Sequence, residues 1–132
     1  MLSWDERYEL GHERIDAEHR IFLSLLGDFE LAMKNGLPKD KQIRILQEIA
    51  KYADFHFLSE ENIMADCHYP DLDHHVGMHT VLLDQVKDYS TRFRLDEING
   101  TEVFEFLFSW FALHTSSEDK KLVGFVSSQK NI

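Results

Sequence analysis

The sequence predicts an all-α fold, an antiparallel bundle whose four helices run up, down, up and down. Apolar residues recur at helical spacing along four segments, the alternation typical of β-strands is absent, and short connections join the segments. At 132 residues, the chain is long enough to bury a core without disulfides. We expect a single domain over 1–132, with an N-terminal arm over 1–15 and the bundle over about 16–126.

The first two helices are predicted from apolar stripes bounded by turn residues. The first begins near Asp16, a suitable N-cap, and ends at the turn "NGLP". The second runs from about Asp40 to the region of Ala65. The stripe of the first helix comprises Phe22, Leu25, Leu26, Phe29 and Met33, and that of the second comprises Ile43, Leu46, Ile49, Ala50 and Ala53.

Two further helices follow clear breaks in the chain. After "CHYPD", Pro70 or Asp71 starts the third helix, which we expect to reach about Tyr89. After the turn "DEING", the fourth begins near Thr101 and continues past Trp110. Because the direction alternates, the starts of the first and third helices meet the ends of the second and fourth.

Histidines and a glutamate gather at this shared end of the predicted bundle. His56 and Glu60 are four residues apart, as are His75 and His79, so each pair shares a helix face. A polar pair on a buried face costs free energy unless a partner satisfies it. We interpret the convergence as a metal site, and the candidate ligands are His19, His56, Glu60, His75, His79 and His114.

The residue types restrict the metal. Imidazole with carboxylate suits iron, zinc or manganese, and the lack of a cysteine cluster argues against structural zinc and iron–sulfur sites. No H-E-x-x-H peptidase motif is present, and only one E-x-x-H occurs where di-iron oxidases need two. The remaining histidines, His12, His68 and His74, are expected in loops or at a helix start.

Four motifs together resemble the hemerythrins, specifically the single-domain bacterial ones. They are "W-x3-Y-x2-G-x3-ID-x2-H" (4–19), "HF-x2-EE-x2-M" (56–64), "YP-x4-H-x3-H" (69–79) and "W-x3-H-x4-D" (110–119). The resemblance implies two non-haem iron ions joined by a bridging oxo or hydroxo group. Hemerythrin-type proteins are themselves among the known up-down-up-down bundles, so the fold is no independent prediction. By resemblance, His75, His79 and His114 bind one iron, His19 and His56 bind the other, and Glu60 and Asp119 bridge them.

The Asp119 assignment requires an irregular helix. Five residues after His114, Asp119 would point about 140° away on a regular helix. Glu118 is the rival at unstrained spacing, whereas the polar segment "TSSEDKK" favours a π-bulge or a break that would serve Asp119. Glu61, adjacent to Glu60, is expected to face elsewhere and to be solvated.

The ligand set that the resemblance implies leaves one position for O2. If each iron takes six ligands, five imidazoles, two bridging carboxylates and one bridging oxygen fill eleven of the twelve positions. The open position lies on the iron with two histidines, where O2 can bind. Two residues depart from the usual family pattern, because Phe111 stands where Leu is common and Thr115 where Ile is common. The expected apolar lining comprises Phe22, Leu23, Phe55 and Phe111.

We therefore expect reversible O2 binding for storage, delivery or sensing, and not primarily an enzyme. The alternatives are a di-iron enzyme that reduces peroxide or nitric oxide, and an iron storage or donating protein. A net charge of −10 argues against nucleic acid, and no apolar stretch is long enough for a membrane span. The lone Cys67 and the acidic start favour the cytoplasm. The sequence identifies no protein partner.

Overall fold

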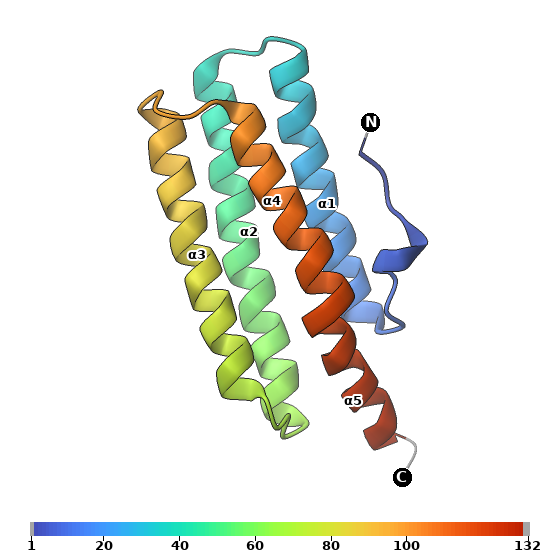
Figure 1. Cartoon of the computed structure of the whole chain (residues 1–132). Coiled ribbons are helices and arrows are strands. Elements are labelled where there is room, and N and C mark those ends of the chain that lie inside the picture. The colour runs from blue at the N-terminus through green and yellow to red at the C-terminus, as the bar shows by residue number, and fades with distance from the viewer. Residues whose placement is uncertain (1, 131–132) are drawn as a thin grey trace.

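The computed structural model describes residues 2–130, which form helices and no strand (Figure 1). The elements are η1 (Glu6–Tyr8), α1 (Glu13–Lys34), α2 (Lys39–Asp66), α3 (Leu72–Arg94), α4 (Gly100–His114), η2 (Thr115–Asp119) and α5 (Lys120–Lys130). α4, η2 and α5 follow one another without a break and form the fourth helix of the bundle. α3 extends past the predicted end at Tyr89, because buried Phe93 continues its apolar stripe. No helix among residues 2–130 is long and apolar enough to cross a membrane.

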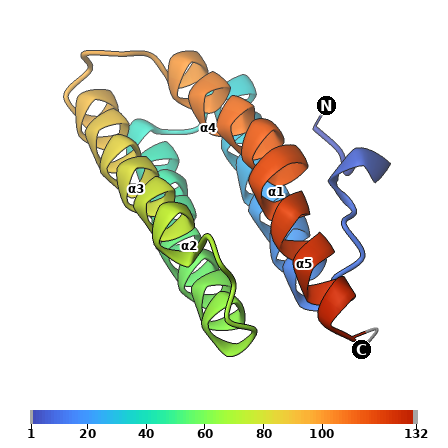
Figure 2. The ribbon, with the colours of Figure 1, turned by 60° about the horizontal axis from the view of Figure 1, so that its bottom comes forward.

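Consecutive helices lie side by side and run in opposite directions. α1 and α2 are joined at one end of the bundle, α2 and α3 at the other, and α3 and α4 at the first end again (Figures 1 and 2). α4 also packs against α1, which completes the bundle. The structure therefore confirms the predicted up-down-up-down topology, with α1 and α3 beginning at the end of the bundle where α2 and α5 end (Figure 1).

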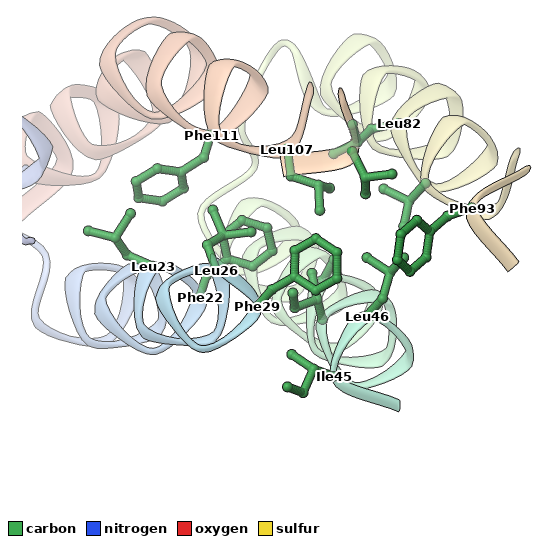
Figure 3. Close-up of a cluster of buried hydrophobic side chains, with 14 of the residues drawn as sticks. Phe22, Leu23, Leu26, Phe29, Ile45, Leu46, Leu82, Phe93, Leu107 and Phe111 are labelled. Carbon is green, nitrogen blue, oxygen red and sulfur yellow. The ribbon is translucent and has the colours of Figure 1, made fainter. Parts of the chain in front are cut away.

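Two apolar clusters form the core and enclose the polar end of the bundle. The larger cluster takes side chains from α1 to α4, including Phe22, Leu26 and Phe29 along one face of α1 (Figure 3). Burying each such side chain contributes about 1.5–3 kcal/mol. The smaller cluster comprises Ile15, Met64, Tyr69, Leu122 and Val123. Its members lie nearer the helix ends than the predicted ligands do, so apolar side chains flank those ligands on both sides along the bundle.

The start of α1 differs from the prediction. The helix begins at Glu13, and the side chain of His12 caps it by accepting a hydrogen bond from the backbone. Asp16 lies inside the helix, where its carboxylate accepts hydrogen bonds from the backbone N–H groups of Leu10 at 2.9 Å and Gly11 at 3.0 Å. Gly11 has a φ of +92°, which favours glycine. Asp16 therefore anchors the arm and does not cap the helix.

The N-terminal arm packs against the bundle beside α1 (Figure 2). The guanidinium of Arg20 lies 4.6 Å from the centre of the Trp4 ring, a cation–π contact. Tyr8 is buried and meets Phe111 edge to face, with 5.2 Å between ring centres. The arm also contacts η2, so it covers the side of the bundle where α4 passes into η2.

The predicted distortion of the fourth helix is a π-helical turn. η2 interposes Thr115–Asp119 between two regular helices. Hydroxyl groups compete for backbone carbonyls in this segment, and Ser116 Oγ donates to the carbonyl of Ala112 at 2.7 Å. The wider turn changes the helical register after His114 and brings Asp119 back toward the histidine cluster.

Candidate metal centre

The seven side chains predicted from the sequence converge at one end of the bundle. All of them are buried, and none is more than 5% exposed. They are His19 from α1, His56 and Glu60 from α2, His75 and His79 from α3, His114 from α4 and Asp119 from η2.

The cluster consists of two overlapping groups of potential ligands. One contains His75, His79 and His114, the other contains His19 and His56, and both contain Glu60 and Asp119. Within each group the candidate ligand atoms lie within 4.8 Å of one another. The donors of each group therefore lie close enough together to hold one cation, and both groups share the two carboxylates.

Glu60 stands between histidines from two helices. Its Oε1 lies 2.6 Å from Nε2 of His75 and 3.3 Å from Nε2 of His79. Its Oε2 lies 3.3 Å from Nε2 of His56, one turn earlier on α2. One carboxylate oxygen thus faces each group.

Asp119 has the same relation to the two groups. Its Oδ2 lies 3.0 Å from Nε2 of His19, and its Oδ1 lies 3.1 Å from Nε2 of His114. Its rival, Glu118, points away from the cluster, is 22% exposed and pairs with Lys121 at 3.6 Å. Asp119 therefore lies among the histidines of the cluster, and Glu118 does not.

The polar atoms of the cluster are poorly satisfied by hydrogen bonds to one another, and a bound metal would satisfy them better. Some histidine nitrogens and carboxylate oxygens of the cluster lie within ion-pair distance but do not form hydrogen bonds. The buried atoms without a hydrogen-bond partner among residues 2–130 are His19 Nδ1, Glu60 Oε2, His79 Nε2, His114 Nε2 and both carboxylate oxygens of Asp119. An unsatisfied buried polar group costs roughly 1–3 kcal/mol. Cations bound by imidazole nitrogen and carboxylate oxygen would satisfy most of these atoms, and this donor set suits iron.

Contacts within the cluster shift pKa values in opposite directions. Burial favours the neutral ring of His56, but the contacts with the carboxylates of Glu18 and Glu60 outweigh it and raise the pKa of His56 to about 10. Burial likewise opposes charge on His75, and contacts with Asp119 and Glu60 raise its pKa to about 9. Burial and the charge of Asp119 oppose ionisation of Glu60, yet surrounding imidazoles lower its pKa to about 2. Burial also opposes ionisation of Asp119, but the neighbouring imidazoles, His114 above all, lower its pKa well below the usual range. Both carboxylates therefore stay ionised, as cation binding requires.

Two further glutamates, which we call the outer carboxylates, were not predicted as part of the site. Glu18 approaches Nδ1 of His56 at 2.6 Å, and Glu61 approaches Nδ1 of His79 at 2.9 Å. The expectation that Glu61 faces elsewhere and is solvated is wrong, because its side chain crosses to α3 and is 26% exposed. No spacing within one helix identifies either residue, because each contacts a histidine on the next helix.

Aromatic side chains surround the imidazoles. Phe111 lies edge-on to His19, at 5.6 Å between ring centres, and Phe57 stacks on His79 at 4.0 Å. Trp110 stacks on His114 at 4.6 Å. Of the predicted lining residues, Phe111 lies beside His19, and Phe22 and Leu23 are buried in the core. The prediction is wrong for Phe55, which is 52% exposed.

The remaining histidines lie outside the cluster. His12 caps α1, and His68 has a positive φ of 55° in the turn between α2 and α3. His74 is exposed on the first turn of α3. The structure therefore separates them from His75 and His79, as expected from the sequence.

Comparisons with known proteins agree with this arrangement. Residues 10–126 match the family described as "Hemerythrin HHE cation binding domain". The chain is 28% identical over 129 residues to the bacteriohemerythrin of Clostridium acetobutylicum, covering 93% of this chain and 99% of that protein. It is 25% identical to the bacteriohemerythrin of Stenotrophomonas maltophilia, over 99% of this chain and 85% of that protein. It is 23% identical to the myohemerythrin of Theromyzon tessulatum, over 92% and 91%.

Proposed function

Because this chain belongs to the hemerythrin family, we propose that it binds O2 reversibly at a non-haem di-iron centre, for oxygen storage, delivery or sensing. The family match covers most of the chain, and proteins named bacteriohemerythrin or myohemerythrin align with nearly all of it. Buried imidazoles and carboxylates at the end of the bundle are the ligands that such iron prefers.

The proposed ligands divide between the two ions. The overlap of the two residue groups supports a pair of ions that share both carboxylates, with the bridging oxo or hydroxo group that the family implies. In this assignment His75, His79 and His114 hold one iron, His19 and His56 hold the other, and Glu60 and Asp119 bridge them.

The observation that carries the proposal is the unequal number of imidazoles in the two groups, three against two. If the two ions have equal coordination numbers, the ion beside His19 and His56 has one position more to offer. When bound, such a centre supplies reducing equivalents and an open position for a diatomic ligand.

Buried aromatic side chains surround this half of the proposed centre. Phe22 and Phe111 stack at 5.6 Å between ring centres, and buried Tyr8 packs on Phe111 from the arm. The phenyl ring of Phe111 beside His19, with Phe22 stacked behind it, carries no proton donor. Their arrangement favours release of unaltered O2 over its reduction.

A di-iron enzyme that reduces peroxide or nitric oxide is the competing function. The named relatives are hemerythrins and none carries the name of an enzyme, in agreement with the expectation of a binding protein. The deciding experiment exposes anaerobically reduced protein to O2, then removes the gas, and follows the visible charge-transfer absorption. Return to the reduced spectrum over several cycles supports the proposal. Permanent oxidation on first exposure, with peroxide released or consumed, supports the enzyme.

Location and partners follow the same reasoning. We propose a cytoplasmic protein, because the single Cys67 is free and suits a reducing compartment. The net charge of −10 disfavours binding to nucleic acid. O2 is the one partner that the site itself supports.

A further inference from the structure

Glu18 holds one of the candidate ligands from the side opposite the cluster. Its Oε1 lies 2.6 Å from Nδ1 of His56, while Nε2 of the same ring faces Glu60 at 3.3 Å. Ser59 Oγ donates to the second oxygen of Glu18 at 2.8 Å, and Nε of Arg14 donates to it at 3.1 Å. Glu18 is 7% exposed, so this is a built contact within the protein interior.

Glu61 makes the corresponding contact in the other group. Its Oε2 lies 2.9 Å from Nδ1 of His79, and Nε2 of that ring faces Glu60 at 3.3 Å. An imidazole that donates its Nδ1–H to a carboxylate keeps its Nε2 lone pair free for a metal and becomes more basic. With a cation on the cluster side, each ring would therefore offer Nε2 to the metal and donate its Nδ1–H to the outer carboxylate.

The two outer carboxylates are distributed evenly over the two groups. Glu18 serves the group of two imidazoles and Glu61 the group of three. Each outer carboxylate contacts a histidine on the next helix in the chain, because Glu18 on α1 contacts His56 on α2 and Glu61 on α2 contacts His79 on α3. The pattern is not general to the cluster, because buried Nδ1 of His19 has no hydrogen-bond partner among the described residues.

We propose that Glu18 and Glu61 are positioning residues, one for each metal ion, and that Glu18 controls the ion beside His19 and His56. This inference rests on the proposed di-metal function. Both carboxylates act through the imidazole they contact, by fixing its tautomer and by adding negative charge behind it. Glu18 has the larger effect, because a buried charge is screened less than that of the partly exposed Glu61.

The test is an anaerobic titration of metal-free full-length chain with Co²⁺, followed by its visible absorption. Glu18→Gln keeps the shape of the side chain and removes its charge, and we expect binding of one of the two equivalents to weaken 10–100-fold. Glu61→Gln weakens the other equivalent by a smaller factor. Glu13→Gln and Glu48→Gln, at exposed sites on the same two helices, are the matched controls for net charge.

A second readout separates positioning from support of the fold. In the iron-loaded protein, removal of the negative charge behind His56 disfavours the ferric state, so Glu18→Gln raises the midpoint potential relative to Glu13→Gln. If Glu18→Gln does not fold, Ser59→Ala removes one hydrogen bond to Glu18 and weakens the same equivalent by a smaller factor.

The possible outcomes are distinguishable. Suppose that the wild type binds two equivalents of Co²⁺, and that Glu18→Gln (or Ser59→Ala in its place) has the same metal affinity and midpoint potential as the control variants. This result overturns the inference and leaves the proposed function intact. Equal weakening of both equivalents by each outer-carboxylate variant also overturns the one-to-one assignment. A wild-type chain that takes up no Co²⁺ overturns the proposed centre, and this inference with it.

Discussion

Oδ2 of Asp119 lies 3.0 Å from Nε2 of His19 and joins the fourth helix of the bundle to the first. The contact depends on η2, because on a regular helix Asp119 would point about 140° away from His114. The irregular turn is therefore part of the site, because it supplies Asp119 and its other residues place that carboxylate among the histidines.

The shared carboxylates predict two iron ions per chain. Protein expressed in iron-replete cells is expected to contain them, because Glu60 and Asp119 each face both ligand groups. Elemental analysis by mass spectrometry checks the number. One iron per chain, or stoichiometric zinc, would contradict the proposed centre.

Removal of the metal is expected to destabilise the bundle at the ligand end, where buried imidazoles and carboxylates then lack their cations. Free metal at a hundredfold excess over Kd stabilises a protein by about 2.7 kcal/mol. For a chain of this length, chelation should lower Tm by roughly 10 °C. Calorimetry before and after chelation measures the change, and an unchanged Tm would show that the cluster is not a metal site.

Loss of adjacent glutamates should have unequal effects. Glu60→Ala removes a carboxylate that contacts histidines of both groups, so most of the bound metal should be lost. Glu61→Ala removes only the support of His79, and the chain should retain both ions with affinity weaker by about tenfold. Metal content after gel filtration distinguishes the two. Equal loss would mean that Glu60 does not bridge.

Phe111→Leu, which restores the usual family residue, is expected to change the rates of O2 release and autoxidation without abolishing binding. The smaller side chain opens space beside His19 and loses contacts with Tyr8 and Phe22, at a cost in stability of about 1 kcal/mol. Stopped-flow absorption measures both rates. Phe55→Leu, on the exposed face of α2, is the control and should leave them unchanged.

Chelated protein should become less stable as pH rises above about 6.5. The pKa values of His56 and His75 are raised to about 10 and about 9 in the folded chain. Their contribution to the free energy of unfolding is therefore complete below the pKa of an unfolded histidine, about 6.5, and is lost as pH rises through the folded values. Glu60 has a pKa lowered to about 2, and its contribution is lost only as pH falls through that value. Thermal unfolding between pH 5 and pH 10 checks this, and a Tm that rises with pH would contradict it.

The convergence of the candidate ligands could be predicted because helical spacing fixes which residues share a face. His56 with Glu60, and His75 with His79, are one turn apart, and the alternating helix directions place both pairs at one end. Asp119 required the resemblance as well, since only a distorted helix brings it to the cluster. The structure supplies that distortion in the polar segment where it was expected.

The errors concern residues adjacent to ligands. Neighbours in sequence point about 100° apart on a helix, so Phe55 cannot line the site that His56 faces. Glu61 has the same angular relation to Glu60, but its long side chain extends across the interface to His79. Such contacts depend on the distance and rotation of the neighbouring helix, which periodicity within one segment does not specify.

The position of Asp119 also sets an order of events during synthesis. Chains emerge from the ribosome at about 5–20 residues per second, N-terminus first. His19, His56, Glu60, His75 and His79 are translated before α4, so the nascent chain holds an incomplete set of donors until η2 has left the exit tunnel. We therefore expect stable acquisition of the proposed metal ions to be a late step, which follows translation of the last helix and closure of the bundle.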